Sequence, residues 1–303
     1  MNTISRRGFL AANAAMLAAS QFPMRAYGQQ TAPLSLAAAK RTLDIDGRAA
    51  TVLGLAGPSG QGLLLDPGQR FSVDLTNDLS VPTIIHWHGQ IPPNAQDGVP
   101  DMPQPLLQPG ETRSFDFAPL SGTHWMHSHV PIQEMQLLAA PLIVRRPEDV
   151  TADRQELVLF LHDFAFKTPE EVLEEITSGG GGGHGAVEVS GSAQGMNHGG
   201  MAGMNHRPAD GTESMPMNMG NMEMDLNDYN WDAYLANDRT LSDPEIVQVE
   251  RGGRVRLRVI NAAAATVFWI DTGTVEGWLV AVDGHEVQPV TGSRFGLAMG
   301  QRL

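Results

Sequence analysis

The alternation of apolar and polar positions between residues 42 and 144 predicts a series of short β-strands. Residues 71–75 (FSVDL) and 114–117 (SFDF) repeat with period two, as a strand with one buried face does. Turn signals recur roughly every 8–15 residues; they are Gly57-Pro58-Ser59-Gly60, Asp66-Pro67-Gly68, Asp97-Gly98 and Pro109-Gly110. Short strands with frequent turns predict an all-β fold, an antiparallel sandwich or a Greek-key barrel.

A polar segment with a proline, residues 145–149 (RRPED), predicts a boundary between two domains, 29–150 and 151–303. Thr168 and Glu171 form a capping box around Pro169 and predict a short helix there. Strand patterns in the second domain cover residues 156–161, 245–249, 255–259 and 277–282. The second domain stops soon after its last strand pattern, so we expect it to be incomplete.

Composition narrows the chemistry. The chain has 303 residues, enough for about two domains at roughly 150 residues each. Acidic residues outnumber basic ones by 34 to 20, which argues against nucleic acid as a partner. The absence of cysteine excludes disulfides, zinc ribbons, iron–sulfur clusters, cysteine nucleophiles and thiolate-bound copper.

The first 28 residues have the pattern of an export signal. Ser5-Arg6-Arg7-Gly8-Phe9-Leu10 precedes an Ala-rich apolar run, and small residues follow at Ala26 and Gly28. This pattern predicts a twin-arginine (Tat) signal that engages the Tat export machinery and is removed near Gly28. The apolar run is too short to span a bilayer, and no stable membrane span is expected elsewhere. We therefore expect a periplasmic protein.

Two His-x-His pairs stand out among the ten histidines: His86-Trp87-His88, and His127-Ser128-His129 after Trp125. Residues i and i+2 of a strand project from one face about 6–7 Å apart, which suits one ligand to each of two neighbouring metal ions. Two such strands side by side would direct four imidazoles into one pocket. Copper, zinc, nickel and iron all accept such ligands. His124 lies outside this pattern and is expected either near the ligands or on the surface.

The motifs H-W-H-G at 86–89 and G-T-x-W-x-H-S-H at 122–129 resemble the first two copper signatures of multicopper oxidases, the family of laccases and copper-resistance oxidases. The resemblance implies that His86 ligates type 2 copper and that His88, His127 and His129 ligate the type 3 copper pair. It also implies a proton-relay role for Asp97; a plain turn residue is the alternative. Trp87 and Trp125 are expected to pack around the site.

The resemblance extends to cupredoxin-like Greek-key domains. Residues 139–144 look like the end of the first domain, whereas 259–262, 282–284 and 300–302 look like parts of a second domain without copper ligands. His162 and His285 are therefore expected to be structural. The family's third and fourth signatures, H-x-x-H-x-H and H-C-H, are absent. They belong to a third domain, so the resemblance implies an N-terminal part with half of the trinuclear ligands and no type 1 copper site.

A segment rich in glycine, methionine and histidine, at about 179–224, is expected to be a disordered insertion. Thioethers are soft ligands that select Cu(I), so the segment could collect cuprous ion; low-complexity drift is the alternative. Its candidate Cu(I) ligands are Met196, His198, Met201, Met204, His206, Met215, Met217, Met219, Met222 and Met224.

These observations predict part of an oxidase that couples one-electron oxidation of Cu(I) or phenols to the reduction of O₂ to water, in the service of copper tolerance. The alternative is a non-catalytic periplasmic protein that buffers copper through the Met/His-rich segment. A scaffold whose copper sites have decayed and a zinc enzyme on the same histidines are weaker alternatives.

Overall fold

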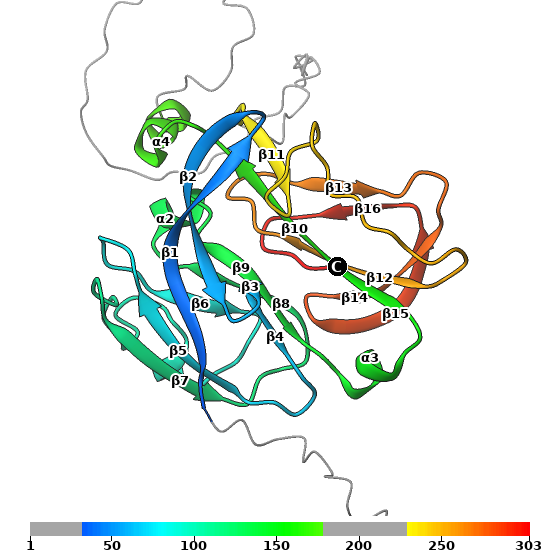
Figure 1. Ribbon diagram of the computed structural model, residues 1–303, viewed down its shortest axis with the longest axis horizontal. Coiled ribbons are helices and arrows are strands. Elements are labelled where there is room, and N and C mark those ends of the chain that lie inside the picture. Colours follow the sequence, from blue (N-terminus) through cyan, green and yellow to red (C-terminus); the bar gives the residue numbers. More distant parts are fainter. Residues whose placement is uncertain (1–31, 178–228) are drawn as a thin grey trace, which may run out of the picture.

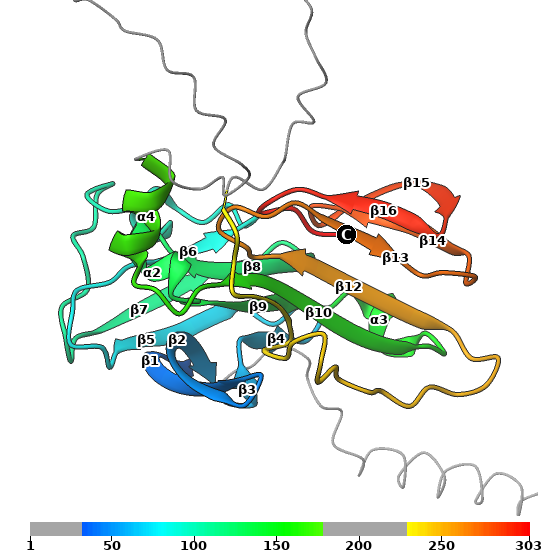
Figure 2. The same ribbon diagram turned by 90° about the horizontal axis from the view of Figure 1, so that it is seen from above.

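The computed structural model describes residues 32–177 and 229–303. The proposed signal at 1–28 and the whole of the segment at 179–224, with its candidate Cu(I) ligands, lie outside these residues. The described chain forms two parts that lie side by side (Figure 1). In the view from above, the helices α2 (Pro131–Met135) and α4 (Pro169–Thr177) lie near each other at the left (Figure 2). The all-β prediction is confirmed, because strands dominate both parts.

The first part is a sandwich of two sheets. The five-stranded sheet has the order β3-β2-β1-β5-β7, and the four-stranded sheet has the order β4-β9-β8-β6. The strands are β1 (Leu34–Ile45), β2 (Arg48–Gly57), β3 (Gly60–Gln61), β4 (Leu63–Leu65), β5 (Phe71–Asn77), β6 (Ile85–His88), β7 (Thr112–Phe117), β8 (Gly122–Ser128) and β9 (Ala139–Val144). A short 3-10 helix, η1 (Asn94–Gln96), and α2 (Pro131–Met135) lie in the connections.

The core of the sandwich follows from the period-two pattern. Strand β5 buries every second residue, as its sequence predicts. Phe71 stacks on Phe117 with ring centroids 4.5 Å apart and contacts Trp87 at 4.7 Å. Because these rings come from both sheets, they join the two layers of the sandwich.

The second part contains a three-stranded sheet and two separate antiparallel pairs of strands. Their orders are β11-β10-β12, β13-β16 and β14-β15. The elements are α3 (Pro147–Thr151), β10 (Gln155–Phe164), α4 (Pro169–Thr177), β11 (Ala233–Ala236), β12 (Val255–Asn261), β13 (Phe268–Asp271), β14 (Gly277–Val282), β15 (His285–Gly292) and β16 (Arg294–Leu297). The capping box of α4 is confirmed: the Glu171 amide donates to Thr168 Oγ1, and the Thr168 amide donates to Glu171 Oε2.

Two expectations about the strands are wrong. Residues 245–249 form no strand, and their side chains are exposed. On the edge of β10 that β11 shares, backbone pairing covers only residues 161–164. The segment 245–249 meets β10 through a side chain instead, since Gln155 Nε2 donates to the carbonyl of Gln248 at 3.2 Å. Pairing is also not purely antiparallel, since β1–β5, β4–β9 and β10–β12 are parallel. In the first part the chain crosses to the other sheet at β4 before β5 returns beside β1.

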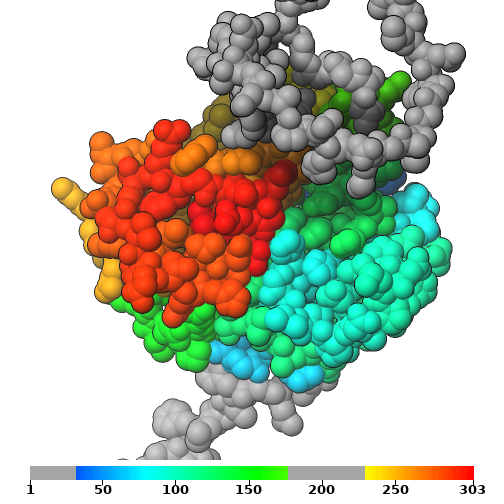
Figure 3. All heavy atoms as spheres, turned by 180° about the vertical axis from the view of Figure 1, so that it is seen from behind, coloured from blue at the N-terminus to red at the C-terminus, as the bar shows by residue number. Residues whose placement is uncertain are grey.

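The two parts share buried surfaces. Val52 and Leu137 of the first part pack in one apolar cluster with Phe164 and Leu235 of the second. A further cluster contains Trp125 beside residues of β10 and β12. Seen from behind, the red and orange residues of the second part touch the cyan and green residues of the first (Figure 3). The division at residue 150 stays a prediction.

The connection between the parts is structured. Asp149 in α3 is buried and forms ion pairs with Arg154, Arg256 and Arg258. Arg256 and Arg258 lie on β12, so the carboxylate fixes this connection to the second part. None of the helices in the described residues is long and apolar enough to cross a bilayer.

Candidate metal centre

Strands β6 and β8 place the histidines. They pair antiparallel, with His86 directly opposite His127 and His88 opposite Trp125. His129 follows the end of β8, and its amide donates to the carbonyl of Ile84 at 3.1 Å. Alternation along each strand then turns His86, His88, His127 and His129 to the same side.

The four imidazole rings lie close together. The ring centroid of His86 is 5.8 Å from that of His88, 5.6 Å from that of His127 and 5.7 Å from that of His129. The rings of His127 and His129 are 6.1 Å apart. The two separations between alternate residues, 5.8 Å for His86 and His88 and 6.1 Å for His127 and His129, are close to the 6–7 Å expected within a strand. The structure therefore brings all four sequence-predicted ligands together.

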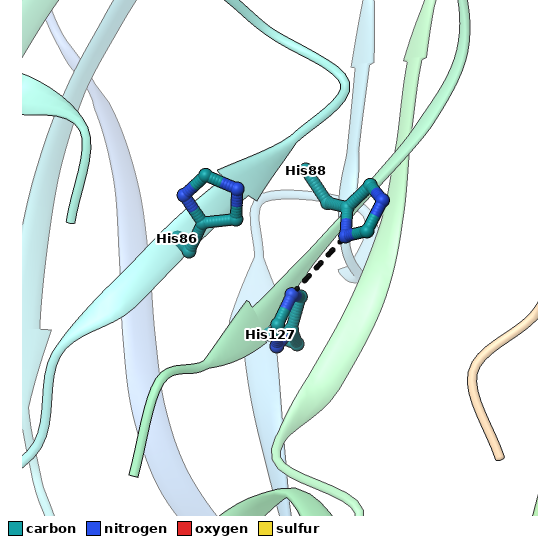
Figure 4. Close-up of side chains that lie close together, drawn as sticks. All are labelled: His86, His88 and His127. Atoms are coloured by element: carbon teal, nitrogen blue, oxygen red, sulfur yellow. Dashed lines mark hydrogen bonds between the residues drawn. The ribbon is translucent and has the colours of Figure 1, made fainter. Parts of the chain in front are cut away.

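Three of these residues have converging nitrogen atoms. His86, His88 and His127 each offer a ring nitrogen, and the three atoms lie within 4.8 Å of one another. Among the described residues this is the one such group of histidine or acidic side chains. His88 Nδ1 and His127 Nε2 are 3.3 Å apart (Figure 4). Two nitrogens bound at ~2.0–2.1 Å to one tetrahedral ion would be separated by about the same distance.

Backbone carbonyls orient two of the rings. His86 Nδ1 lies 2.9 Å from the carbonyl oxygen of Asp97, and His127 Nδ1 lies 3.0 Å from that of Ser128. A carbonyl only accepts, so each Nδ1 carries the hydrogen and each Nε2 presents its lone pair. Such contacts fix the tautomer of metal-binding histidines.

Burial keeps the rings of His88 and His127 uncharged. It lowers the pKa of His127 to about 3. Burial, together with the charge of Arg302, lowers the pKa of His88 to about 4. Both rings are neutral at pH 7, which is the form that binds a metal ion. The donor set thus fits a first-row transition metal.

Gly98 brings the Asp97 loop close to β6. Its φ is +79°, and a Cβ there would lie 1.8 Å from the carbonyl oxygen of Ile85. Only glycine combines this backbone conformation with this approach. Beside it, Asp97 Oδ1 lies 3.6 Å from His86 Nδ1, and the carboxylate is one-third exposed.

Trp125 packs against the site as expected, but the same expectation for Trp87 is wrong, because its ring contacts Phe71 and Phe115 in the core. Trp125 stacks on His127 with centroids 4.3 Å apart and lies 5.0 Å from His88. Trp87 points into the sandwich core and donates from Nε1 to the carbonyl of Gln96 at 2.8 Å.

The other histidines of the described residues, His124, His162 and His285, lie apart from the converging group. The surface alternative for His124 is wrong, because the residue is 2% exposed. Its ring fills the seam between the parts, where a Cβ on Gly284 would lie 2.6 Å from it. His162 is buried in β10 and His285 is exposed. Within the described chain, the ring nitrogens of His124 and His162 have no hydrogen-bond partner.

Two charged residues near the site were missed by the sequence-based reasoning. Glu134 Oε1 lies 3.6 Å from His127 Nδ1, and burial raises the pKa of this carboxyl to about 7. Arg302 lies near His88, and a Cβ on Gly300 would be 3.3 Å from that ring. Glu134 could have been found from the sequence, because it lies only five residues after the proposed ligand His129. Nothing local in the sequence marks the approach of Arg302.

Comparison with known proteins agrees with the motifs. Two family models, both described as multicopper oxidase, match residues 39–149 and 157–303. Copper resistance protein A of Escherichia coli is 30% identical over 253 residues, covering 82% of this chain and 40% of the relative. Multicopper oxidase MmcO of Mycobacterium tuberculosis is 26% identical over 324 residues, covering 98% and 60%. The chain thus spans 40–60% of the length of these relatives.

Solved structures show the same fold. The blue copper oxidase from Nitrosomonas europaea aligns with a TM-score of 0.62 at 21% identity, over 88% of this chain and 72% of that one. The laccase from Botrytis aclada aligns with a TM-score of 0.61 at 24% identity, over 88% and 44%. The expected cupredoxin-like fold is confirmed. Two matching family models, a copper-protein relative at 30% identity and a shared fold together show that this chain belongs to the multicopper oxidase family.

Proposed function

We propose that His86, His88, His127 and His129 are copper ligands in an oxidase that couples one-electron oxidation of Cu(I) or phenols to the reduction of O₂ to water. The observation that carries the proposal is the convergence of three imidazole nitrogens from β6 and β8, which lie within 4.8 Å of one another. When bound, copper supplies one-electron redox chemistry and a place for oxygen. Imidazole nitrogens suit copper, and the family of the chain selects copper among the metals that accept them.

The individual roles rest on distances. The 3.3 Å separation between His88 Nδ1 and His127 Nε2 supports their binding one type 3 copper together. His129, at the end of β8, serves the second type 3 copper. His86, whose Nδ1 is held by the Asp97 carbonyl, serves the type 2 copper through Nε2.

Asp97 is the proposed proton carrier. Its carboxylate is one-third exposed and lies 3.6 Å from His86 Nδ1, so it can exchange a proton with solvent beside the ligand cluster. In the complete oxidase, we expect Asp97→Asn to retain copper and to slow O₂ consumption. A variant with unchanged O₂ consumption would exclude this role.

Copper tolerance in the periplasm is the proposed setting. The relative named copper resistance protein A supports it, as do the Met/His-rich segment and the twin-arginine pattern of the sequence. Cu(I) is the proposed physiological substrate, and phenols are a secondary class. The remaining cluster ligands and the type 1 site would come from an H-x-x-H-x-H and H-C-H region. Sequencing the gene past codon 303 tests this: no such segment in any frame would contradict the oxidase proposal.

Copper titration of the full chain tests the ligand set. The metal-free protein is titrated with Cu(II) and Cu(I), and bound copper is measured after desalting. Replacing all four proposed ligands with alanine should abolish the cluster-bound copper, whereas the exposed His285→Ala control should bind as the parent does. Deleting residues 195–224 distinguishes the buffer alternative. If all bound copper disappears on that deletion and none on the fourfold substitution, the buffer function replaces the oxidase proposal.

A further inference from the structure

A cavity of about 350 Å³ lies between β2, α2 and the start of α4. The end of β10 and Trp231 complete its wall, so residues of both parts line it. None of the four proposed copper ligands is among the lining residues. Its size lies within the range of ~300–1,000 Å³ that is usual for small-molecule sites.

The cavity has an apolar and aromatic floor. Val52 and Phe164 are buried members of the apolar cluster that joins the two parts. Phe166 packs edge-on against Phe164 with centroids 4.9 Å apart. Trp231 adds a half-buried indole ring to the wall. A flat ring could contact these side chains by stacked or edge-to-face geometry.

Two basic side chains, those of Arg48 and Lys167, also line the cavity. The Arg48 guanidinium lies over the ring of Phe166, with its central carbon 3.6 Å from the centroid. Arg48 has no ion pair in the described part of the chain, and Lys167 on the same wall is paired with Glu175. No acidic residue lines the cavity, although acids outnumber bases in the whole sequence. A guanidinium stacked by its face keeps its N–H edge free to donate to a carboxylate.

We propose that this cavity binds a small aromatic monocarboxylate. The carboxylate would accept hydrogen bonds from Arg48, and the ring would lie against Phe166 and Trp231. A neutral phenol would leave the guanidinium without a partner, and a non-aromatic acid would lose the ring contacts. The proposal concerns a separate site and does not depend on the proposed oxidase function.

The test uses benzoate as the probe and the metal-free full chain, so that copper cannot bind the carboxylate. Calorimetric titration gives the dissociation constant, with benzyl alcohol and cyclohexanecarboxylate as matched neutral and non-aromatic probes. We expect saturable binding of benzoate, and binding weaker by about tenfold or more for either matched probe.

Two substitutions locate the site. Arg48→Gln should weaken benzoate binding by about tenfold or more, the loss expected for a charge-assisted hydrogen bond. Phe166→Leu should weaken it by removing the ring on which the guanidinium stacks. Arg251→Gln, at another exposed arginine, is the control and should leave binding unchanged. Because Arg48 is exposed, its variant should keep the melting temperature of the parent. Absence of saturable benzoate binding, or equal affinity in the Arg48→Gln chain, would overturn the proposal.

Discussion

The Nδ1 atom of His88 lies 3.3 Å from the Nε2 atom of His127, although the two residues come from different strands and are 39 positions apart. Without a metal, the two nitrogens can form at most one hydrogen bond with each other. With a metal, both can bind the same ion. The pair should therefore dominate metal affinity. We expect His88→Ala to weaken copper binding by on the order of 100-fold, measured by competition with a chelator.

The His127→Ala variant should show a similar loss, and the double variant should lose little more than either single one. Strictly additive losses in binding free energy would mean that the two rings serve different ions. His285→Ala controls for the removal of one exposed imidazole.

Gly98 should be intolerant of a side chain. We expect Gly98→Ala to lower the free energy of unfolding by more than the ~1–2 kcal/mol of a left-handed residue alone, since its Cβ would meet the Ile85 carbonyl at 1.8 Å. Gly110→Ala is the matched control, because Gly110 has a similar φ of +76° and nothing within 4 Å of its Cβ position. Denaturant titration measures both. Equal losses would show that the β6 contact does not matter.

The seam between the parts should show coupling between Gly284 and His124. The Gly284→Ala Cβ would lie 2.6 Å from His124 Cε1, so the substitution should destabilise the protein. In a His124→Ala background the same substitution should cost less, because the imidazole is gone. A double-mutant cycle should give a coupling of about 1 kcal/mol or more. A coupling energy near zero would mean that Gly284→Ala destabilises the protein through strain in the backbone of its turn and not through contact with His124.

Acid should destabilise the metal-free protein through His162. Burial lowers the pKa of this histidine to about 4 from an ordinary value of 6.5. Between these values the unfolded chain binds the proton and the folded chain does not, so the free energy of unfolding falls as the pH falls. The slope from this group approaches about 1.4 kcal/mol per pH unit, and it vanishes below pH 4.

Replacing His162 with leucine should remove that contribution. The free energy of unfolding is measured at pH 6.5 and at pH 4. Its fall between these two pH values should be smaller by roughly 3 kcal/mol in His162→Leu than in the parent. His124, His88 and His127 also have lowered pKa values, so part of the slope should remain. The exposed His285→Leu is the control. A parent-like slope in His162→Leu would mean that this imidazole is already hydrated in the fold.

Local sequence patterns correctly predicted those structural features that depend only on residues close together in the sequence. The period-two run at 71–75 became β5, the capping box at Thr168 began α4, and both His-x-His pairs came from adjacent strands. Convergence of four rings could be predicted because strand alternation fixes the side on which i and i+2 lie.

Contacts between distant segments could not be predicted in this way. The alternating residues 245–249 look like a strand, but alternation cannot reveal that they meet β10 through the side chain of Gln155 and not through a backbone ladder. The parallel pairs depend on where the chain crosses between sheets. Burial of His124 depends on Gly284, 160 residues later, and no local pattern encodes that approach.

The shared apolar cluster has a consequence for synthesis. The ribosome synthesises Val52 and Leu137 together with the rest of the first part. Leu235, which packs against them, lies 91 residues beyond Val144, the last residue of β9. At about 5–20 residues per second, a ribosome needs on the order of ten seconds to deliver it. During that interval the nascent first part presents an uncovered apolar face, so a molecular chaperone has a defined surface and a defined time in which to act.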